Sequence, residues 1–222
     1  AQRFAPAVAA LLRRTTFDAA VAPVLAYVNR TVLAVLPAHT LGVCARAMRE
    51  HFPTRYAELR GIANALGGAV SADYLAMLAY YHELAHAAAT ARNDGAAGAP
   101  RSCTGIVARS DGSENSGRTL HARNFDQALG TSNRLVTTHV RFVRDGAPVL
   151  DVAGSWYWLA AGGMTAVRAG VVSLEENWRS AGAPSVAPDA LLAAIAGGVV
   201  PQTHLFRHVL EAWQPSGSSG GG

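Results

Sequence analysis

The chain has 222 residues, of which half are apolar and 15% are charged, and this balance excludes a protein that is disordered throughout. Its formal net charge of +4 comes from 19 basic residues, every one of them arginine, against 15 acidic ones. These arginines are scattered from Arg3 to Arg207 rather than gathered in one stripe, so we expect no nucleic-acid partner. No apolar run reaches the roughly 18–20 residues that a membrane span requires.

The first 92 residues are rich in Ala and Leu, with apolar side chains three and four positions apart, which is the period of a helix. Proline residues and the pair Gly67-Gly68 interrupt this pattern. The spacing predicts four helices, at Ala5–Tyr27, Val32–His51, Pro53–Leu66 and Ser71–Arg92, with Pro23 and Pro37 bending or splitting the first two. Residues 93–102 carry strong turn signals and predict an exposed linker at the end of a helical segment, residues 1–102.

After Ser102 the pattern changes to short runs typical of strands. The runs Thr104–Arg109 and Thr119–Phe125 flank a loop of turn-forming residues, which predicts a hairpin. If Ser110 pairs with Arg118, the register places residue 125 opposite Cys103.

The rest of this second segment, residues 103–215, predicts an antiparallel meander followed by helices. The expected strands are Leu135–Val143, Val149–Val152, Trp156–Ala160 and Met164–Leu174, and the expected helices are Asp189–Ala196 and Pro201–Trp213. Residues 216–222 are Ser- and Gly-rich and predict a flexible tail. The fold class is therefore α+β, with a helical segment followed by an antiparallel sheet with helices.

One candidate site is a match to the HExxH zinc-protease pattern, formed by His82, Glu83 and His86 on a predicted helix. A zinc protease needs a third protein ligand, and the residues that follow include Ala89 and Arg92 where the extended motif requires Gly and His. Because no third ligand is evident, we expect no metal or other cofactor. A zinc metallopeptidase stays open as an alternative function.

The other candidate site lies at one end of the predicted hairpin, where the register brings Cys103 close to Arg123 and Asp126. Cleavage between Ser102 and Cys103 would free an α-amine with an ordinary pKa of roughly 7.7–8, which could take the proton of the thiol beside it. Arg123 would stabilise the thiolate and Asp126 the new ammonium. This pattern is typical of an N-terminal nucleophile hydrolase. The simpler alternative is a buried free Cys with an Arg–Asp salt bridge nearby.

The block Cys103–Ala108, the block His121–Asp126 and the helical segment before them resemble the acid ceramidase and N-acylethanolamine acid amidase family. The resemblance implies an αββα N-terminal nucleophile fold and a precursor that cleaves itself. It implies that Cys103 is the nucleophile and that Arg123 and Asp126 are catalytic. A supporting carboxylate is implied at Glu176, or at Glu175 instead.

The resemblance covers about residues 74–179 and includes departures from the family pattern. Ala122 stands where the family has Gly, and the loop between Ala108 and His121 is longer. Family members also continue well past this length, with further strands and an Asn that helps form the oxyanion site. We therefore expect the sheet of this chain to be incomplete at its C-terminal end.

By the same resemblance, the substrate would be a lipid amide, an N-acylethanolamine or a ceramide, and the cleaved product an α/β heterodimer. The family implies a lysosomal or secreted protein, in which the sequon at Asn29 would be glycosylated. Trp156, Tyr157 and Trp158 would line an acyl pocket or form a buried aromatic strand. A helix face could contact lipid or lie in the core, and its residues are Leu75, Met77, Leu78, Tyr81 and Leu84.

The state of Cys44 and the activity of the chain each leave two alternatives open. Cys44 is expected to be a buried free thiol, or to pair with a region outside this chain. A truncated relative without activity, which binds lipid or a partner, stays open beside the active amidase.

Overall fold

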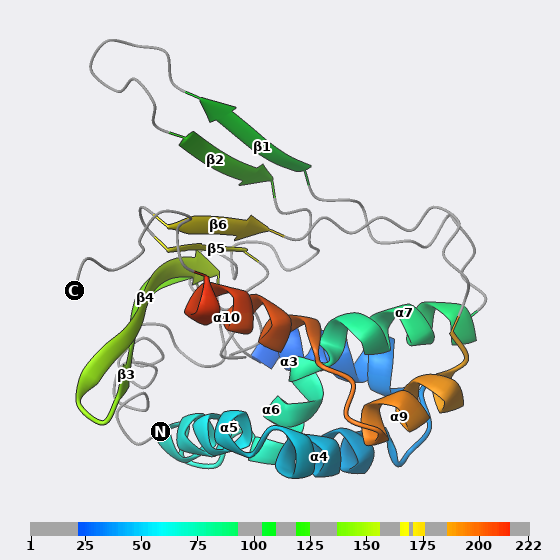
Figure 1. Cartoon of the computed structure of the whole chain (residues 1–222). Coiled ribbons are helices and arrows are strands. Elements are labelled where there is room, and N and C mark those ends of the chain that lie inside the picture. Colours follow the sequence, from blue (N-terminus) through cyan, green and yellow to red (C-terminus); the bar gives the residue numbers. More distant parts are fainter. Residues whose placement is uncertain are drawn as a thin grey trace.

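The computed structural model describes residues 22–92, 104–109, 119–124, 137–155, 165–168, 171–175 and 186–213. Over these residues the chain combines helices with antiparallel sheets, which confirms the α+β class (Figure 1). The helices are α3 (Ala22–Val28), the π-helix η1 (Asn29–Leu33), α4 (Thr40–His51), α5 (Pro53–Ala65), α6 (Ala72–Ala79), α7 (Tyr81–Ala91), α9 (Pro188–Ala196) and α10 (Gln202–Ala212).

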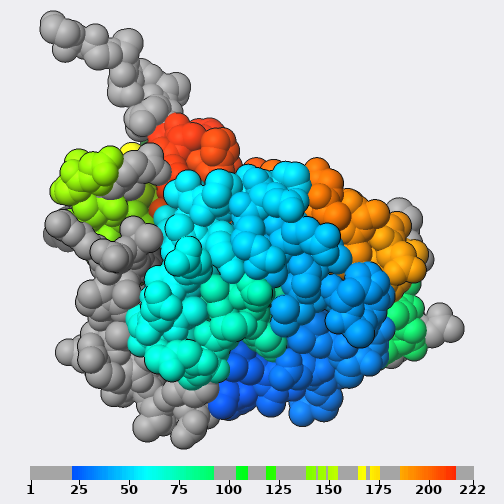
Figure 2. Space-filling view, turned by 90° about the horizontal axis from the view of Figure 1, so that it is seen from below, coloured from blue at the N-terminus to red at the C-terminus, as the bar shows by residue number. Residues whose placement is uncertain are grey.

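The helical body has one apolar core, in which Cys44, Met48 and Leu75 are fully buried. Leu192 and Ile195 of α9 belong to this same core although they lie about a hundred positions further along the chain. Figure 2 shows α9, in orange, packed against the blue surface of α4. A helix from the C-terminal half therefore completes the helical body of the N-terminal half.

Two predicted helices are divided in the structure. The expected helix Val32–His51 begins only at Thr40, because Pro37 lacks the amide hydrogen that an uninterrupted helix needs there. The expected helix Ser71–Arg92 is wrong as a single element, since α6 ends and α7 begins at Tyr80. Tyr80 has φ −95° and ψ 12°, and its buried side chain donates a hydrogen bond to the carbonyl of Val199, 3.3 Å away.

The main sheet is an antiparallel meander in the order β3-β4-β5-β6, as the sequence predicts. Its strands are β3 (Thr137–Arg144), β4 (Ala147–Ser155), β5 (Thr165–Arg168) and β6 (Val172–Glu175). The single strand expected over Met164–Leu174 is wrong, because the chain turns there and β5 pairs with β6. The strand expected at Trp156–Ala160 lies outside the described residues.

Strands β1 (Thr104–Arg109) and β2 (Thr119–Asn124) form a separate hairpin. Thr104 lies opposite Asn124, and Arg109 lies opposite Thr119. This is the register predicted from the sequence, and it is confirmed over every described pair of the hairpin.

The main sheet has a different layer on each face (Figure 1). On one face, Phe142, Leu150 and Val152 form a small core with Leu210 of α10. Arg168 fastens the end of that helix, because its Nη1 donates to the carbonyls of Leu210 at 2.9 Å and Trp213 at 3.0 Å. The hairpin lies over the other face, at β5 and β6. Helix, sheet and hairpin thus follow one another as three layers.

Candidate functional site

The candidate site lies where the hairpin meets the main sheet. Residues directly opposite each other in an antiparallel pair share a face, so Gly105, His121 and Arg123 share one face of the hairpin. These three are half-buried, whereas Ile106 and Leu120 on the outer face are each 59% exposed. The end of the hairpin that follows Cys103 in sequence is therefore the end that packs against the sheet.

Glu175 of β6 is the carboxylate of this contact. Its Oε2 lies 2.8 Å from Nε2 of His121, and the two side chains are only 14% and 9% exposed. A methyl group added to Gly105 would lie 1.1 Å from Glu175 Oε1. Only glycine at position 105 leaves room for this carboxylate against β1.

Arg123 and His121 reach two further residues on the same face of the sheet. Arg123 donates a hydrogen bond from Nη1 to the hydroxyl of Thr165 on β5. The Nδ1 atom of His121 contacts the hydroxyl of Ser173 on β6. Thr165 lies directly opposite Glu175 in the sheet, so cationic, imidazole, hydroxyl and carboxylate groups meet in one small volume.

Of the residues predicted for catalysis, Arg123 is the one that the structure describes, and it lies in this contact. Ser102, Cys103, Asp126 and Glu176 lie outside the described residues, as do the aromatic residues Trp156, Tyr157 and Trp158. Between the two alternatives for the supporting carboxylate, Glu175 is the one described, and it occupies the contact.

His121 and Ser173 are residues of this contact for which the sequence motifs predict no role. The confirmed register does indicate that His121 lies beside Arg123. His121 is two positions before Arg123 on the same strand, so the two side chains share a face. No signal of this kind existed for Ser173, since its contact depends on how the hairpin stacks on the sheet.

Cys44 is not suited to act as a nucleophile. It is a buried free thiol among the described residues, as predicted. Burial raises the pKa of this thiol to about 12, and the negative charge of Glu83 adds to the effect. Because the thiolate is the reactive form, Cys44 is inert near neutral pH. Cys103 is the second of the chain's two cysteines.

The HExxH residues have structural contacts on α7. Glu83 accepts a hydrogen bond through Oε1 from the backbone N–H of Gln202, 2.9 Å away, at the first turn of α10. The rings of His82 and His86 lie edge to face with centroids 5.1 Å apart. Within the described part of the chain, no three His, Cys, Asp or Glu side chains gather as a metal site would require.

The helix face considered for lipid contact is buried. Leu75, Met77 and Leu84 are at 0% exposure, Leu78 at 1% and Tyr81 at 6%, so the core alternative holds for these residues. Over the ranges that the structure describes, none of the helices has the length and apolarity of a membrane span.

Asn29 of the sequon is exposed in η1, and its Oδ1 accepts a hydrogen bond from the hydroxyl of Tyr74 at 2.7 Å. An N-linked glycan is attached to Nδ2 of the asparagine, so this hydrogen bond to Oδ1 does not itself oppose glycosylation.

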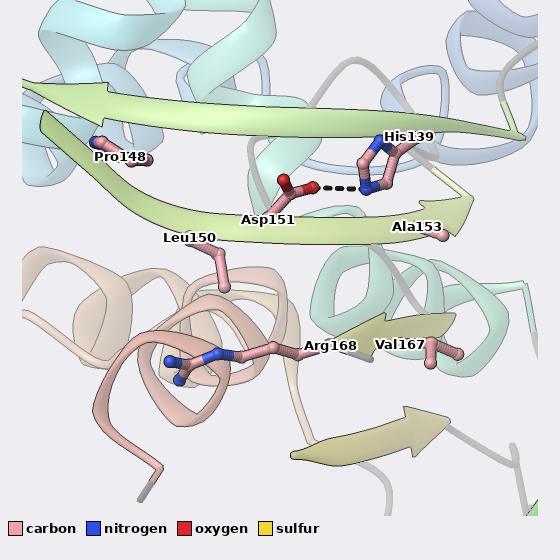
Figure 3. A pocket seen from close by; sticks show the side chains of 7 residues that line it. All are labelled: His139, Pro148, Leu150, Asp151, Ala153, Val167 and Arg168. Carbon is pink, nitrogen blue, oxygen red and sulfur yellow. Dashed lines mark ion pairs between the residues drawn. The ribbon is translucent and has the colours of Figure 1, made fainter. Parts of the chain in front are cut away.

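A pocket of about 560 Å³ opens in the same sheet, a volume typical of small-molecule sites. Figure 3 shows Ala153 and Val167 at one end and Pro148 at the other, with an ion pair between His139 and Asp151 at the rim. Val167 pairs with Ser173 across β5 and β6. Val167 and Ala153 therefore place one end of the pocket on the face that carries the candidate site.

No family model, no curated protein and no solved structure matches the chain.

Proposed function

We propose that this chain is an N-terminal nucleophile hydrolase that cleaves the linear amide of a lipid. The precursor is cut between Ser102 and Cys103, and the Cys103 thiolate then attacks the acyl carbon of the substrate. The amine leaves, and water releases the fatty acid from the acyl-cysteine. The substrate class, an N-acylethanolamine or a ceramide, rests on the sequence resemblance described above, as does a lysosomal or secreted location.

The observation that carries this proposal is the packed end of the hairpin. Gly105 lies two positions after Cys103, and strand alternation predicts that the two residues share a face. On that face lie the guanidinium of Arg123 and the carboxylate of Glu175. A cation lowers the pKa of a nearby thiol and so favours the nucleophilic form. Asp126 follows Arg123 by three positions and would hold the free amine.

The layer order supports the same proposal. A helix, a sheet and a second pair of strands over the opposite face are three of the four layers of an αββα sandwich. Cleavage would also leave the two fragments associated, because Leu192 and Ile195 of α9 lie in the core of the helical body. An α/β heterodimer is the proposed mature form.

The test is the intact mass of the purified chain before and after incubation at acidic pH, beside the variant Cys103→Ala. We expect two fragments divided between Ser102 and Cys103 in the wild type and an uncut variant, after which lipid-amide hydrolysis can be assayed. A wild-type chain that stays intact under every condition would overturn the proposal and favour the inactive relative or the zinc peptidase.

Gly105→Ala is expected to slow this self-cleavage at least tenfold without unfolding the protein. The added methyl group would take the position of the Glu175 carboxylate, which sits at the end of a flexible side chain and can move away. The fragments are quantified by mass over time, and stability is followed by thermal unfolding.

Gly42→Ala is the matched control, since nothing lies within 4 Å of a methyl group added there. Gly42 is in α4, so this change is expected to raise stability by about 0.5–1 kcal/mol and to leave cleavage unchanged. Equal cleavage rates in the two variants would contradict a role for the carboxylate over Gly105.

A further inference from the structure

Ser173, His121 and Glu175 lie in a row at the contact between the hairpin and the sheet. The Ser173 hydroxyl contacts Nδ1 of His121, and the opposite ring atom, Nε2, lies 2.8 Å from Glu175 Oε2. We infer that these three side chains form a second acyl-transfer centre with Ser173 as its nucleophile. Nothing in this inference depends on Cys103 or on cleavage of the chain.

The order of the three groups matches the requirements of an activated hydroxyl. A neutral imidazole carries a proton on one ring nitrogen and a lone pair on the other. A proton on Nε2, 2.8 Å from the carboxylate oxygen, leaves the lone pair on Nδ1, the atom that contacts the hydroxyl. Glu175 then positions the ring and stabilises the imidazolium that forms, as a carboxylate does in serine hydrolases of unrelated folds.

Exposure of the three side chains also suits this role. The His121 and Glu175 side chains are 9% and 14% exposed, so the base and its partner are shielded from water. Ser173 itself is exposed, so a substrate can reach the hydroxyl. Since interactions between charges strengthen as water is excluded, the shielded pair holds the imidazole firmly.

The neighbouring pocket indicates the substrate class. Val167 lies directly opposite Ser173 and directly opposite Ala153, and both Val167 and Ala153 line the pocket of about 560 Å³ (Figure 3). The rest of the lining is mixed, with Pro148 and Leu150 beside the polar or charged side chains of His139, Asp151 and Arg168. Adjacent strands are about 5 Å apart, so a short acyl chain in the pocket would place its carbonyl carbon at Ser173. The substrate class is an ester with a short apolar acyl group.

The reaction has two balanced steps. In the first, a bond forms between Ser173 Oγ and the acyl carbon, the hydroxyl proton passes to His121 Nδ1, and the alcohol leaves with that proton. In the second, His121 takes a proton from water, the hydroxide attacks the acyl carbon, and the acid leaves as the proton returns to Ser173 Oγ.

The test uses a fluorophosphonate bearing a short alkyl group, with intact mass and peptide mapping of the full chain. We expect one covalent adduct, located at Ser173, and none in Ser173→Ala. His121→Gln is expected to slow labelling at least a hundredfold, because Gln keeps a polar side chain at this position but is no base. Glu175→Gln should slow labelling as well, and Glu175→Asp should restore part of the rate.

Two control variants make the outcome decisive. His208→Gln replaces an exposed histidine of α10 that does not line the pocket, and it should label at the wild-type rate. Cys103→Ala should also label normally, which separates this centre from the proposed thiol nucleophile. The inference is overturned by the absence of an adduct at Ser173, or by an adduct that forms equally fast in His121→Gln.

Discussion

Replacing Arg207 with methionine is expected to lower the free energy of unfolding by about 3 kcal/mol. Arg207 is 1% exposed, its Nε lies 2.6 Å from Glu211 Oε1, and its Nη2 lies 3.6 Å from Glu58 Oε1. Its guanidinium carbon is 3.2 Å from the centroid of the Phe142 ring. Removing this cation leaves the two partly buried carboxylates of Glu58 and Glu211 with one positive charge fewer to balance them.

The expected loss lies at the lower end of the range for a broken buried ion pair, which is about 3–5 kcal/mol. Arg55 also contacts both carboxylates, at 3.4 Å from Glu58 and 3.0 Å from Glu211, and would keep them paired. Burial alone would raise the pKa of Glu211, but these two arginines hold this pKa below its ordinary value. Chemical denaturation at neutral pH measures the change.

Arg49→Met is the matched control for this substitution. Arg49 pairs with Asp73 at 2.8 Å, but the two side chains are 45% and 40% exposed, and exposed pairs contribute at most about 1 kcal/mol. If the free energy of unfolding falls equally in the two variants, the buried cluster does not stabilise the packing of α10 against the rest of the protein.

This cluster explains why the position of α10 could not be predicted from the sequence. The amphipathic pattern predicted a helix at Pro201–Trp213, and α10 covers nearly the same residues. Its partners are Glu58 on α5 and Phe142 on β3, far away in sequence. Periodicity reports which side of a helix is apolar, but contacts between distant segments are not encoded in any local pattern.

Local signals did predict the parts of the fold that depend on neighbouring residues. The hairpin register follows from the turn between Arg109 and Thr119, and it is confirmed. The meander is confirmed as well, but its last strand was predicted as one element and is two. The alternation of apolar residues across this segment concealed the change of direction between β5 and β6.

The candidate site was predictable to the same extent. The register placed Arg123 near the start of β1, and the structure puts it on the packed face. The stacking of the hairpin on β5 and β6 brings Glu175 and Ser173 to His121. No pattern within either segment indicates this stacking, so Ser173 received no role at the level of sequence.

The protein is expected to lose stability as the pH falls below about 6.5, because His204 is buried as the neutral imidazole. Burial, and then the positive charges of Arg55 and Arg207, lower the pKa of His204 to about 3. The unfolded chain takes up this proton near pH 6.5 and the folded protein does not. Stability is therefore present above pH 6.5 and falls continuously down to about pH 3. At pH 4.5 the loss is on the order of 2–3 kcal/mol.

His204→Leu is expected to flatten this acid slope, as measured by denaturant unfolding at pH 7 and pH 4.5. Glu211 on the same helix has a lowered pKa, but such a carboxylate loses its contribution only below its ordinary range, about pH 4. His208→Leu is the control, since His208 is exposed on the same helix, and it should keep the wild-type slope. An unchanged slope in His204→Leu would contradict the neutral buried imidazole. A steep slope that depends on His204 would favour the secreted location over the lysosomal one, because the protein would be least stable in acid.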